Sequence, residues 1–198
     1  MNNSAIKKLV FVTNNGHKFK EIKQVLENRI ILLSLADIGF SNEIPEEQNT
    51  LEGNAAQKAF LIYHKFGIDC FADDTGLEIE ALQGEPGVYS ARFAGANCTF
   101  EENMNLVLLK MAGKNNREAQ FRTVIALVEK GRLTTFEGKI KGIITHKRRG
   151  TKGFGYDPVF QPKGYRQTFA EMSLKQKNLI SHRALAVNAF MKYLIPDI

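Results

Sequence analysis

Short apolar runs and segments of helical period alternate along most of the chain. Residues 9–12 form an apolar run that predicts a buried strand, and residues 19–26 then carry apolar side chains at helical spacing. The same two patterns recur further on. They predict strands over residues 30–33, 68–72 and 77–81 and helices over residues 54–66 and 101–111.

The second half of the chain contains a hairpin signal and a helical end. Apolar-rich segments over residues 121–128 and 133–144 predict two strands joined by a tight turn at Lys130-Gly131. From Ser173 onward the pattern is helical, with a break near Ser181. Helices interleaved with strands indicate an α/β fold, in which a mixed twisted sheet is flanked by helices.

Composition places the chain among ordinary globular proteins. Its 198 residues are 43% apolar and 24% charged, which excludes global disorder and predicts one domain spanning residues 1–198. The longest apolar run, residues 30–35, is far shorter than the ~20 residues that span a bilayer, and residues 1–8 carry no secretory-signal pattern. Two cysteines form no disulfide scaffold, and Cys70 is predicted to be buried. We therefore expect a cytoplasmic protein with no membrane partner.

Charge is divided unevenly along the chain. The 27 Lys and Arg residues against 21 Asp and Glu residues give a net charge of +6. Residues 42–80 carry 2 Lys and 9 Asp/Glu, whereas residues 139–183 carry 11 Lys/Arg and 2 Asp/Glu. A basic excess alone would favour a nucleic-acid partner. An acidic block together with a basic block instead favours a site that holds a metal ion and a phosphate.

The polar segment after the first predicted strand is a candidate phosphate site. It reads Thr13-Asn14-Asn15-Gly16-His17-Lys18 and begins the first predicted helix. A helix N-terminus offers free N–H groups and a positive dipole end to a phosphate, and Lys18 adds a charge. The alternative is an ordinary capped turn with a solvated lysine. No P-loop sequence, G-x-x-x-x-G-K-[ST], occurs in the chain.

Two adjacent carboxylates stand at the end of the predicted strand 68–72, which ends in Asp73-Asp74-Thr75-Gly76. Buried and unpaired, they would repel each other at a large cost in stability. A divalent cation would remove that cost, and carboxylates with water and phosphate oxygens are the usual surroundings of Mg²⁺. Glu46, Glu47 and Glu52 lie upstream, and one of them could complete the ligands. The alternative is a solvated turn.

Two later segments are candidates for binding a base. Residues 150–158 combine three glycines with Phe154 and Tyr156, and glycines allow close backbone approach while aromatic rings stack on bases. The alternative there is a basic hairpin tip. Residues 173–183 contain Lys177 and end in His182-Arg183, cationic or hydrogen-bonding groups that could face one cleft. The alternative there is a solvated helix face.

Taken in order, these segments resemble the inosine-triphosphate pyrophosphatase family, over about residues 7–194. Six motifs in the same order make the resemblance specific, although each alone is weak. They are matched by Thr13, Asn15 and Lys18, by Pro45-Glu46 with Thr50 to Ala55, by Ala72 to Gly76, by Pro86 to Arg92, by Gly153 to Pro158, and by Lys177 with Ser181 to Arg183.

The departures from the family pattern are small. Thr75 stands where many members have Ser, which keeps the hydroxyl group. The acidic loop reads Glu46-Glu47-Gln48-Asn49 in place of the commoner E-x-x-E-T-G. Its distance from Thr50 favours Glu46 as the metal ligand, with Glu47 and Glu52 as the alternatives.

The resemblance implies a fold in two lobes around a central substrate cleft. It implies Mg²⁺-dependent hydrolysis of ITP, dITP and XTP to the nucleoside monophosphate and pyrophosphate, in a cytoplasmic homodimer that clears these nucleotides from the pool. Asp74 would be the catalytic base, and Asp74, Glu46 and Asp73 would hold the metal. The substrate-binding residues would be Thr13, Asn14, Asn15, Gly16, His17, Lys18, Thr75, Phe154, Gly155, Tyr156, Asp157, Lys177, His182 and Arg183.

Selectivity follows from hydrogen bonding at the base edge. His182 and Arg183 present donors, which match the O6 acceptor of hypoxanthine or xanthine and oppose the amino group of adenine. This does not explain how guanine, which also has O6, would be rejected. The alternatives are a related pyrophosphatase acting on other modified nucleotides and a basic nucleic-acid-binding module. Lys147, Arg148 and Arg149 have no role in any of these interpretations.

Overall fold

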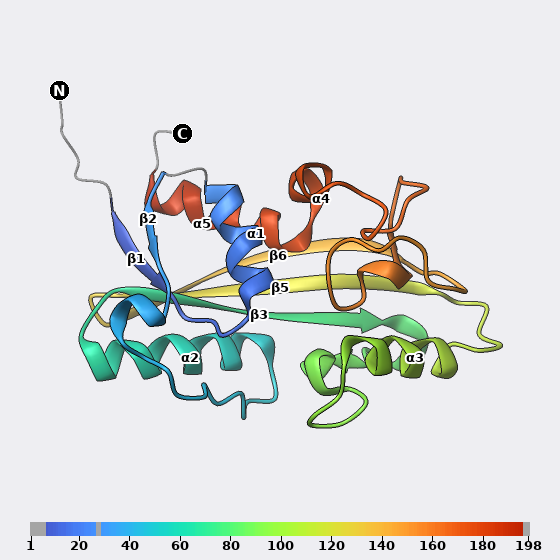
Figure 1. The fold of residues 1–198 in the computed structure, drawn as a ribbon, viewed down its shortest axis with the longest axis horizontal. Helices are drawn as coiled ribbons and strands as arrows, with labels where there is room; N and C mark the ends of the chain where they lie inside the picture. Colours follow the sequence, from blue (N-terminus) through green and yellow to red (C-terminus); the bar gives the residue numbers. More distant parts are fainter. Residues whose placement is uncertain (1–6, 27–28, 196–198) are drawn as a thin grey trace. The chain divides into compact units, whose positions relative to one another are not determined.

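The computed structural model describes residues 7–26 and 29–195 (Figure 1). Residues 1–6, on which part of the expectation about a secretory signal depends, lie outside this part. The helices are α1 (Gly16–Leu26), α2 (Leu51–Phe66), α3 (Phe100–Lys110), α4 (Leu174–Ile180) and α5 (His182–Leu194). The strands are β1 (Lys8–Phe11), β2 (Ile31–Leu33), β3 (Cys70–Ile79), β4 (Pro86–Gly87), β5 (Glu118–Glu129), β6 (Arg132–Ile144) and β7 (Phe160–Pro162).

The strands of the described residues form one mixed sheet in the order β2-β1-β3-β5-β6-β7, with β4 paired to β3. β1 pairs in parallel with β2 and with β3, in the registers Leu9 with Leu32 and Val10 with Cys70. β4 is antiparallel to β3, and β7 is antiparallel to β6. The predicted mixed α/β fold is confirmed.

Contacts divide the chain into two compact units. Unit 1 comprises the chain up to Asp74, Val124–Glu137 and the chain from Ala186 on. Unit 2 comprises Thr75–Thr123 and Gly138–Leu185. The division falls within β3, β5, β6 and α5, so no linker marks it. The expectation of a substrate cleft stays a prediction.

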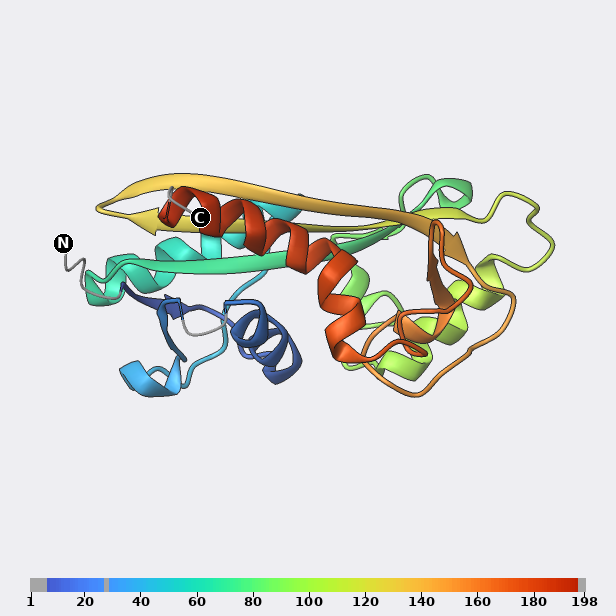
Figure 2. The same ribbon diagram turned by 90° about the horizontal axis from the view of Figure 1, so that it is seen from above.

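Unit 1 has helices on both sides of its strands (Figure 1). Successive side chains of a strand point to opposite faces, and β1 and β3 follow this rule. Leu9, Phe11 and Phe71 pack in one core with α1 and α5, whereas the intervening residues of the two strands pack in another core with α2. The hairpin of β5 and β6 and the neighbouring α5 can be followed in Figure 2. The ring of Phe190 in α5 packs against the ring of Phe136 in β6.

Unit 2 has its own apolar core. Met104, Val107 and Met111 from α3 and its end belong to the same cluster as Leu77 and Ile79 of β3. Further members come from the later strands and the loops that follow them: Phe121, Ile144, Val159, Phe160, Phe169 and Met172. Each unit therefore has a packed apolar core of its own, and the polar side chains of that unit are held by elements anchored in this core.

Capping residues explain where the helices begin. Thr50 accepts a hydrogen bond from the N–H of Gly53, so α2 begins at Leu51, three residues before its predicted start. Ser173 forms a capping box with Gln176 at the start of α4, as Thr99 does with Glu102 at the start of α3. The predicted break near Ser181 is confirmed, because α4 ends at Ile180 and α5 begins at His182.

The prediction of two separate strands over residues 68–72 and 77–81 is wrong, and so is the alternative of a solvated turn at residues 73–76. β3 runs unbroken from Cys70 to Ile79. Asp73 and Asp74 both have cationic partners, so the strand stays buried and extended through them. Gly76 serves close packing in place of a turn, since a Cβ there would lie 2.7 Å from the carbonyl oxygen of Gly87.

No helix in the described part of the chain combines the length and apolar character needed to cross a membrane.

Candidate active site

Two neighbouring carboxylates on β3 face different partners in unit 1. Asp73 lies on the face toward α1, and its Oδ1 is 3.1 Å from Nζ of Lys18. Asp74 lies on the face toward α2, where its Oδ2 accepts a hydrogen bond of 3.1 Å from Nδ2 of Asn54. This is the geometry that alternation along a strand dictates, and it separates the two negative charges.

A buried lysine joins Asp74 to the acidic loop before α2. Nζ of Lys58 is 2.5 Å from Oε1 of Glu46 and 3.7 Å from Oδ1 of Asp74. Lys58 is 4% exposed and Asp74 is 6% exposed. A charged ammonium can be buried here because two carboxylates compensate it.

The surroundings shift the pKa of these groups in opposite directions. Burial raises the pKa of Asp74 above its ordinary value, against the attraction of Lys58 and Lys18. Burial also disfavours charge on Glu46, but the attraction and hydrogen bond of Lys58 outweigh it and lower the pKa of Glu46. Desolvation of Lys58 is likewise outweighed by the carboxylates, so its pKa is raised. Asp74 therefore has a raised proton affinity beside a fixed cation.

The three candidate glutamates lie in different surroundings. Glu46 contacts Lys58. Glu47 is exposed, and its carboxylate accepts a hydrogen bond from the side chain of Gln57. Glu52 lies in the first turn of α2, where it favours the helix dipole. Among the three, Glu46 shares a cationic partner with Asp74.

The donor set of Glu46, Asp73 and Asp74 suits a hard cation, because all its ligands are carboxylate oxygens. Within residues 7–26 and 29–195, no group of three or more His, Cys, Asp or Glu side chains is arranged to hold a metal ion. Mg²⁺ commonly takes only one or two protein carboxylates and completes its shell with water and phosphate. These carboxylates could therefore supply one or two of the ligands of a Mg²⁺ ion, with water and phosphate oxygens supplying the others.

The loop between β1 and α1 is organised by its own side chains. Oγ1 of Thr13 accepts a hydrogen bond from the N–H of Asn15, and Oδ1 of Asn15 accepts from the N–H groups of His17 and Lys18. Asn15 thus caps α1. The loop also directs Lys18 toward Asp73, whereas Asn14 and Gly16 are exposed at its surface.

A buried ion pair organises the glycine-rich loop of unit 2. Oδ2 of Asp157 lies 2.6 Å from Nζ of Lys177, and both side chains are 3% exposed. The same oxygen accepts a hydrogen bond of 3.0 Å from the N–H of Phe154. A Cβ at Gly153 would lie 2.0 Å from this oxygen, so the turn requires glycine there. Asp157 therefore fixes the backbone that carries Phe154.

The ring of Phe154 lies beside two cations. Nζ of Lys177 is 5.1 Å and Cζ of Arg183 is 5.5 Å from its centroid. Nη2 of Arg183 donates to Oγ1 of Thr75 at 3.2 Å, and Oγ1 of Thr75 lies 2.7 Å from Oγ1 of Thr123. The structure thus brings together Phe154, Lys177, Arg183 and Thr75, which the sequence predicted as site residues.

Two further predicted base-binding residues are buried in unit 2, as Asp157, Lys177 and Arg183 are. His182 is 2% exposed and its ring stacks on Phe121, with 4.5 Å between centroids. Tyr156 is 4% exposed, and its hydroxyl donates to the carbonyl oxygen of Ser90. Burial raises the pKa of Tyr156 well above its usual range. Gly155 lies between Phe154 and Tyr156 with φ of 60°.

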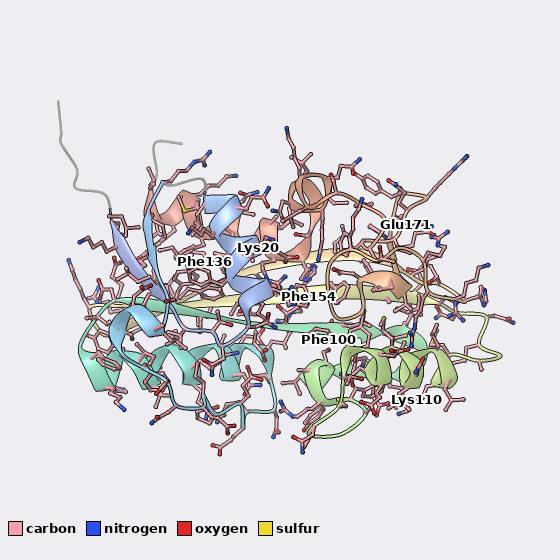
Figure 3. The ribbon with its side chains drawn as sticks, in the orientation of Figure 1. Lys20, Phe100, Lys110, Phe136, Phe154 and Glu171 are labelled. Carbon is pink, nitrogen blue, oxygen red and sulfur yellow. The ribbon has the colours of Figure 1, made fainter. Side chains whose placement is uncertain are left out.

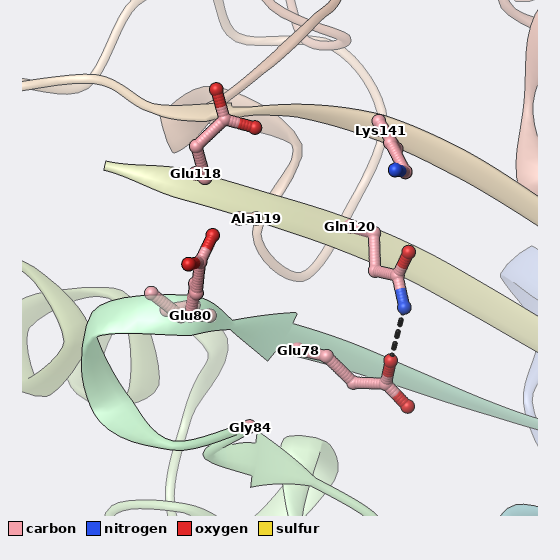
Figure 4. Close-up of a pocket in the computed structure, with 8 residues that line it drawn as sticks. Glu78, Glu80, Gly84, Glu118, Ala119, Gln120 and Lys141 are labelled. Atoms are coloured by element: carbon pink, nitrogen blue, oxygen red, sulfur yellow. Dashed lines mark hydrogen bonds between the residues drawn. The ribbon is translucent and has the colours of Figure 1, made fainter. Parts of the chain in front are cut away.

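A pocket of about 320 Å³ lies elsewhere in unit 2 (Figure 4). Its lining includes Glu78, Glu80, Glu118 and Lys141, and the side chain of Gln120 donates to Glu78 across it. None of its lining residues was predicted for the site. Two glutamates of the acidic block 42–80, Glu78 and Glu80, therefore line this pocket of unit 2.

Sequence reasoning missed Lys58 and Asn54. Both lie one turn apart on the buried side of α2, with Ala55, Ala59 and Ile62. A lysine in such an apolar stripe is rarely buried without a partner, and this signal was available in the sequence. The pairing of Lys58 with both Glu46 and Asp74 was not, because it depends on the path of the acidic loop.

The fold is shared with solved structures. The Staphylococcus aureus Ham1 protein superposes with a TM-score of 0.87 at 34% identity, covering 97% of this chain and 100% of that chain. This defines the class of protein as a mixed α/β protein with the Ham1 architecture. The Ham1 family model matches residues 9–193, and the chain belongs to the Ham1 family.

Relatives at higher identity carry a functional name. A dITP/XTP pyrophosphatase of Flavobacterium johnsoniae is 50% identical over 187 residues, which cover 94% of this chain and 97% of the relative. A dITP/XTP pyrophosphatase of Porphyromonas gingivalis is 48% identical over 191 residues, covering 96% and 98%. The likeness therefore spans nearly the full length of each chain.

Proposed function

We propose that this chain hydrolyses deaminated purine nucleoside triphosphates, ITP, dITP and XTP, to the monophosphate and pyrophosphate. The observation that carries the proposal is the buried group of Asp74, Lys58 and Glu46 in a chain of the Ham1 family. Relatives at 48% and 50% identity named dITP/XTP pyrophosphatase support the substrate class.

Asp74 is the proposed general base. Burial raises the pKa of its carboxyl, and a carboxylate at this place can take the proton of an attacking water. Lys58 holds its charge beside this carboxylate and keeps the group oriented. Lys18 and the loop of residues 13–18 are the proposed triphosphate contacts, with Lys18 supplying positive charge next to Asp73.

Mg²⁺ is the proposed metal, held by Glu46 and Asp74 with Asp73 nearby. When bound, it neutralises phosphate oxygens and lowers the pKa of bound water. Glu46 has a lowered pKa and stays ionised at neutral pH, as a metal ligand must. The two residues that would hold the ion, Glu46 and Asp74, are also the carboxylate partners of Lys58.

The side chains around Phe154 are the proposed base site. Phe154 offers an aromatic face, and Arg183 places a guanidinium 5.5 Å from its centroid. A guanidinium is a donor that cannot lose its proton, so it favours the O6 acceptor of hypoxanthine and xanthine over the amino group of adenine. Lys177 and His182 are the further proposed contacts, Asp157 and Tyr156 shape the loop, and Thr75 orients Arg183.

The test is hydrolysis of ITP, XTP, dITP, GTP and ATP with and without Mg²⁺, with the products identified. We expect the three deaminated substrates to give monophosphate and pyrophosphate only with the metal. Release of inorganic phosphate with a nucleoside diphosphate, or a preference for another modified nucleotide, would overturn the proposal. A homodimer in the cytoplasm is expected from the resemblance, and light scattering tests the dimer.

A further inference from the structure

An aromatic side chain that no motif includes lies next to Phe154. Phe100 is the first residue of α3, and its ring centroid is 6.0 Å from that of Phe154 with the planes tilted by 47° (Figure 3). Phe100 is 43% exposed, and Phe154 is partly exposed. Two neighbouring aromatic rings with uncovered surface form an apolar edge on unit 2.

Two sets of hydrogen bonds hold the first turn of α3, and with it Phe100, in place. Thr99 and Glu102 form a capping box that sets the first turn of α3. Nη1 of Arg148 donates to Oε1 of Glu101 at 2.7 Å, and Nη2 donates to the carbonyl oxygen of Glu101 at 3.3 Å. Arg148, which the sequence left without a role, thus ties the start of α3 to the segment that leads into the glycine-rich loop.

The ring of Phe154 has both charged and apolar neighbours. Lys177 and Arg183 bring positive charge to its ring, whereas Phe100 brings apolar surface. A purine needs both, because its faces are flat and apolar while its edge carries hydrogen-bonding groups. We propose that Phe100 is a second aromatic contact of the purine base and a binding residue for the substrate. This inference rests on the proposed function.

The expected kinetic signature follows from the place of the contact. A ring that touches only the base holds the substrate equally in the ground state and the transition state, because the reacting phosphorus lies far along the molecule. Its loss should raise KM and leave kcat unchanged. Stacking does not read the atoms of the base edge, so ITP and XTP should be affected alike.

The first experiment compares Phe100→Ala with Leu109→Ala, an exposed position of the same helix. We expect the KM for ITP and for XTP to rise by about 5- to 30-fold in Phe100→Ala, with kcat within about twofold of the parent. Leu109→Ala should leave both constants unchanged. A loss of kcat at constant KM would instead indicate that Phe100 only supports the fold.

The second experiment reads the contact without turnover. The chain contains no tryptophan, so the Phe100→Trp variant carries a single indole as its fluorescent reporter. Inosine monophosphate should quench the indole emission of Phe100→Trp in a saturable manner, and Leu109→Trp should show no change. If the parent hydrolyses ITP while Phe100→Ala keeps its KM and the emission of Phe100→Trp is unaffected, the inference is wrong and the proposed function stands. If ITP is not hydrolysed, the proposed function fails by itself.

Discussion

Neighbouring residues of the same type have different chemistry in this chain. Asp73 pairs with Lys18, whereas Asp74 lies between Asn54 and Lys58 and has a raised pKa. A sequence shows only that two carboxylates are adjacent. Their distinct roles follow from which helix each one faces.

Replacing Asp74 with Asn tests the general base directly. Asn keeps the size and accepts the same neighbours but cannot take a proton, so we expect kcat for ITP to fall by about 10²- to 10⁴-fold. Binding of inosine monophosphate, measured by calorimetry, should persist. Glu43→Gln, an exposed change in the same acidic segment, is the control. Full activity in Asp74→Asn would remove Asp74 as the base.

The two cysteines should differ sharply in reactivity. Burial raises the pKa of the Cys70 thiol to about 12, so at pH 8 almost none of it is the reactive thiolate. Cys98 is only partly buried. We expect iodoacetamide to modify Cys98 alone in the folded chain and both residues in urea, as read by mass spectrometry. Modification of Cys70 in the folded chain at pH 8 would contradict its burial.

At the scale of elements, local pattern predicted most of the fold. Apolar periodicity located α1, α2, α3 and the hairpin of β5 and β6, because each of these has a continuous apolar face. It failed at β3, where Asp73-Asp74 resembles a turn and only the lysines of two helices allow the strand to continue. The short strand β7 gave no signal, because three residues show no period.

For the candidate site, the sequence predicted several of the residues that the structure brings together, but not all of their contacts. Motif order located the residues around Phe154 and the carboxylates of β3. It did not reveal that Asp157 binds Lys177 inside unit 2 or that Phe100 lies beside Phe154, since both contacts join segments far apart in the chain. Such pairings depend on tertiary packing, which no local pattern encodes.

Alanine substitutions at Gly153 and Gly155 can be compared to measure how much the Asp157 carboxylate contributes to stability. Gly153 and Gly155 both have positive φ, at 75° and 60°, so alanine strains the backbone at either position. Only at Gly153 does the added Cβ meet Oδ2 of Asp157, because nothing lies within 4 Å at Gly155. We expect Gly153→Ala to lose about 2–4 kcal/mol more stability in urea unfolding, as the buried Lys177 loses its partner. Equal losses would show that the ion pair adjusts freely.

At the scale of the whole molecule, the division of charge has several separate causes. Glu46, Asp73 and Asp74 are candidate site residues in unit 1, whereas Glu78 and Glu80 line a pocket of unit 2. The basic block is equally mixed. Arg149 donates to the side chain of Gln161 and to the carbonyl oxygen of Arg166, which gives it a structural role. A net charge of +6 is therefore no guide to a nucleic-acid partner.

Ligand stabilisation separates the two partner classes. At 100 times its Kd, a ligand that binds only the folded chain adds about 2.7 kcal/mol. For a chain of this size that raises Tm by about 5–10 °C. We expect this from inosine monophosphate and no shift from single-stranded RNA at physiological salt, both measured by scanning calorimetry. A shift with RNA alone that disappears at high salt would favour the nucleic-acid module.

The continuous strand β3 has a consequence for how this chain can change during evolution. Deletion of either aspartate between Ala72 and Thr75 would leave one carboxylate facing Lys18 and would turn every following side chain to the other face, so Thr75 would stand where a carboxylate now faces Lys58. A substitution alters the contacts of one side chain, whereas an insertion or deletion moves every later side chain of the strand to the opposite face. The segment can therefore accept new residue types one at a time, but it cannot gain or lose a residue and keep its chemistry.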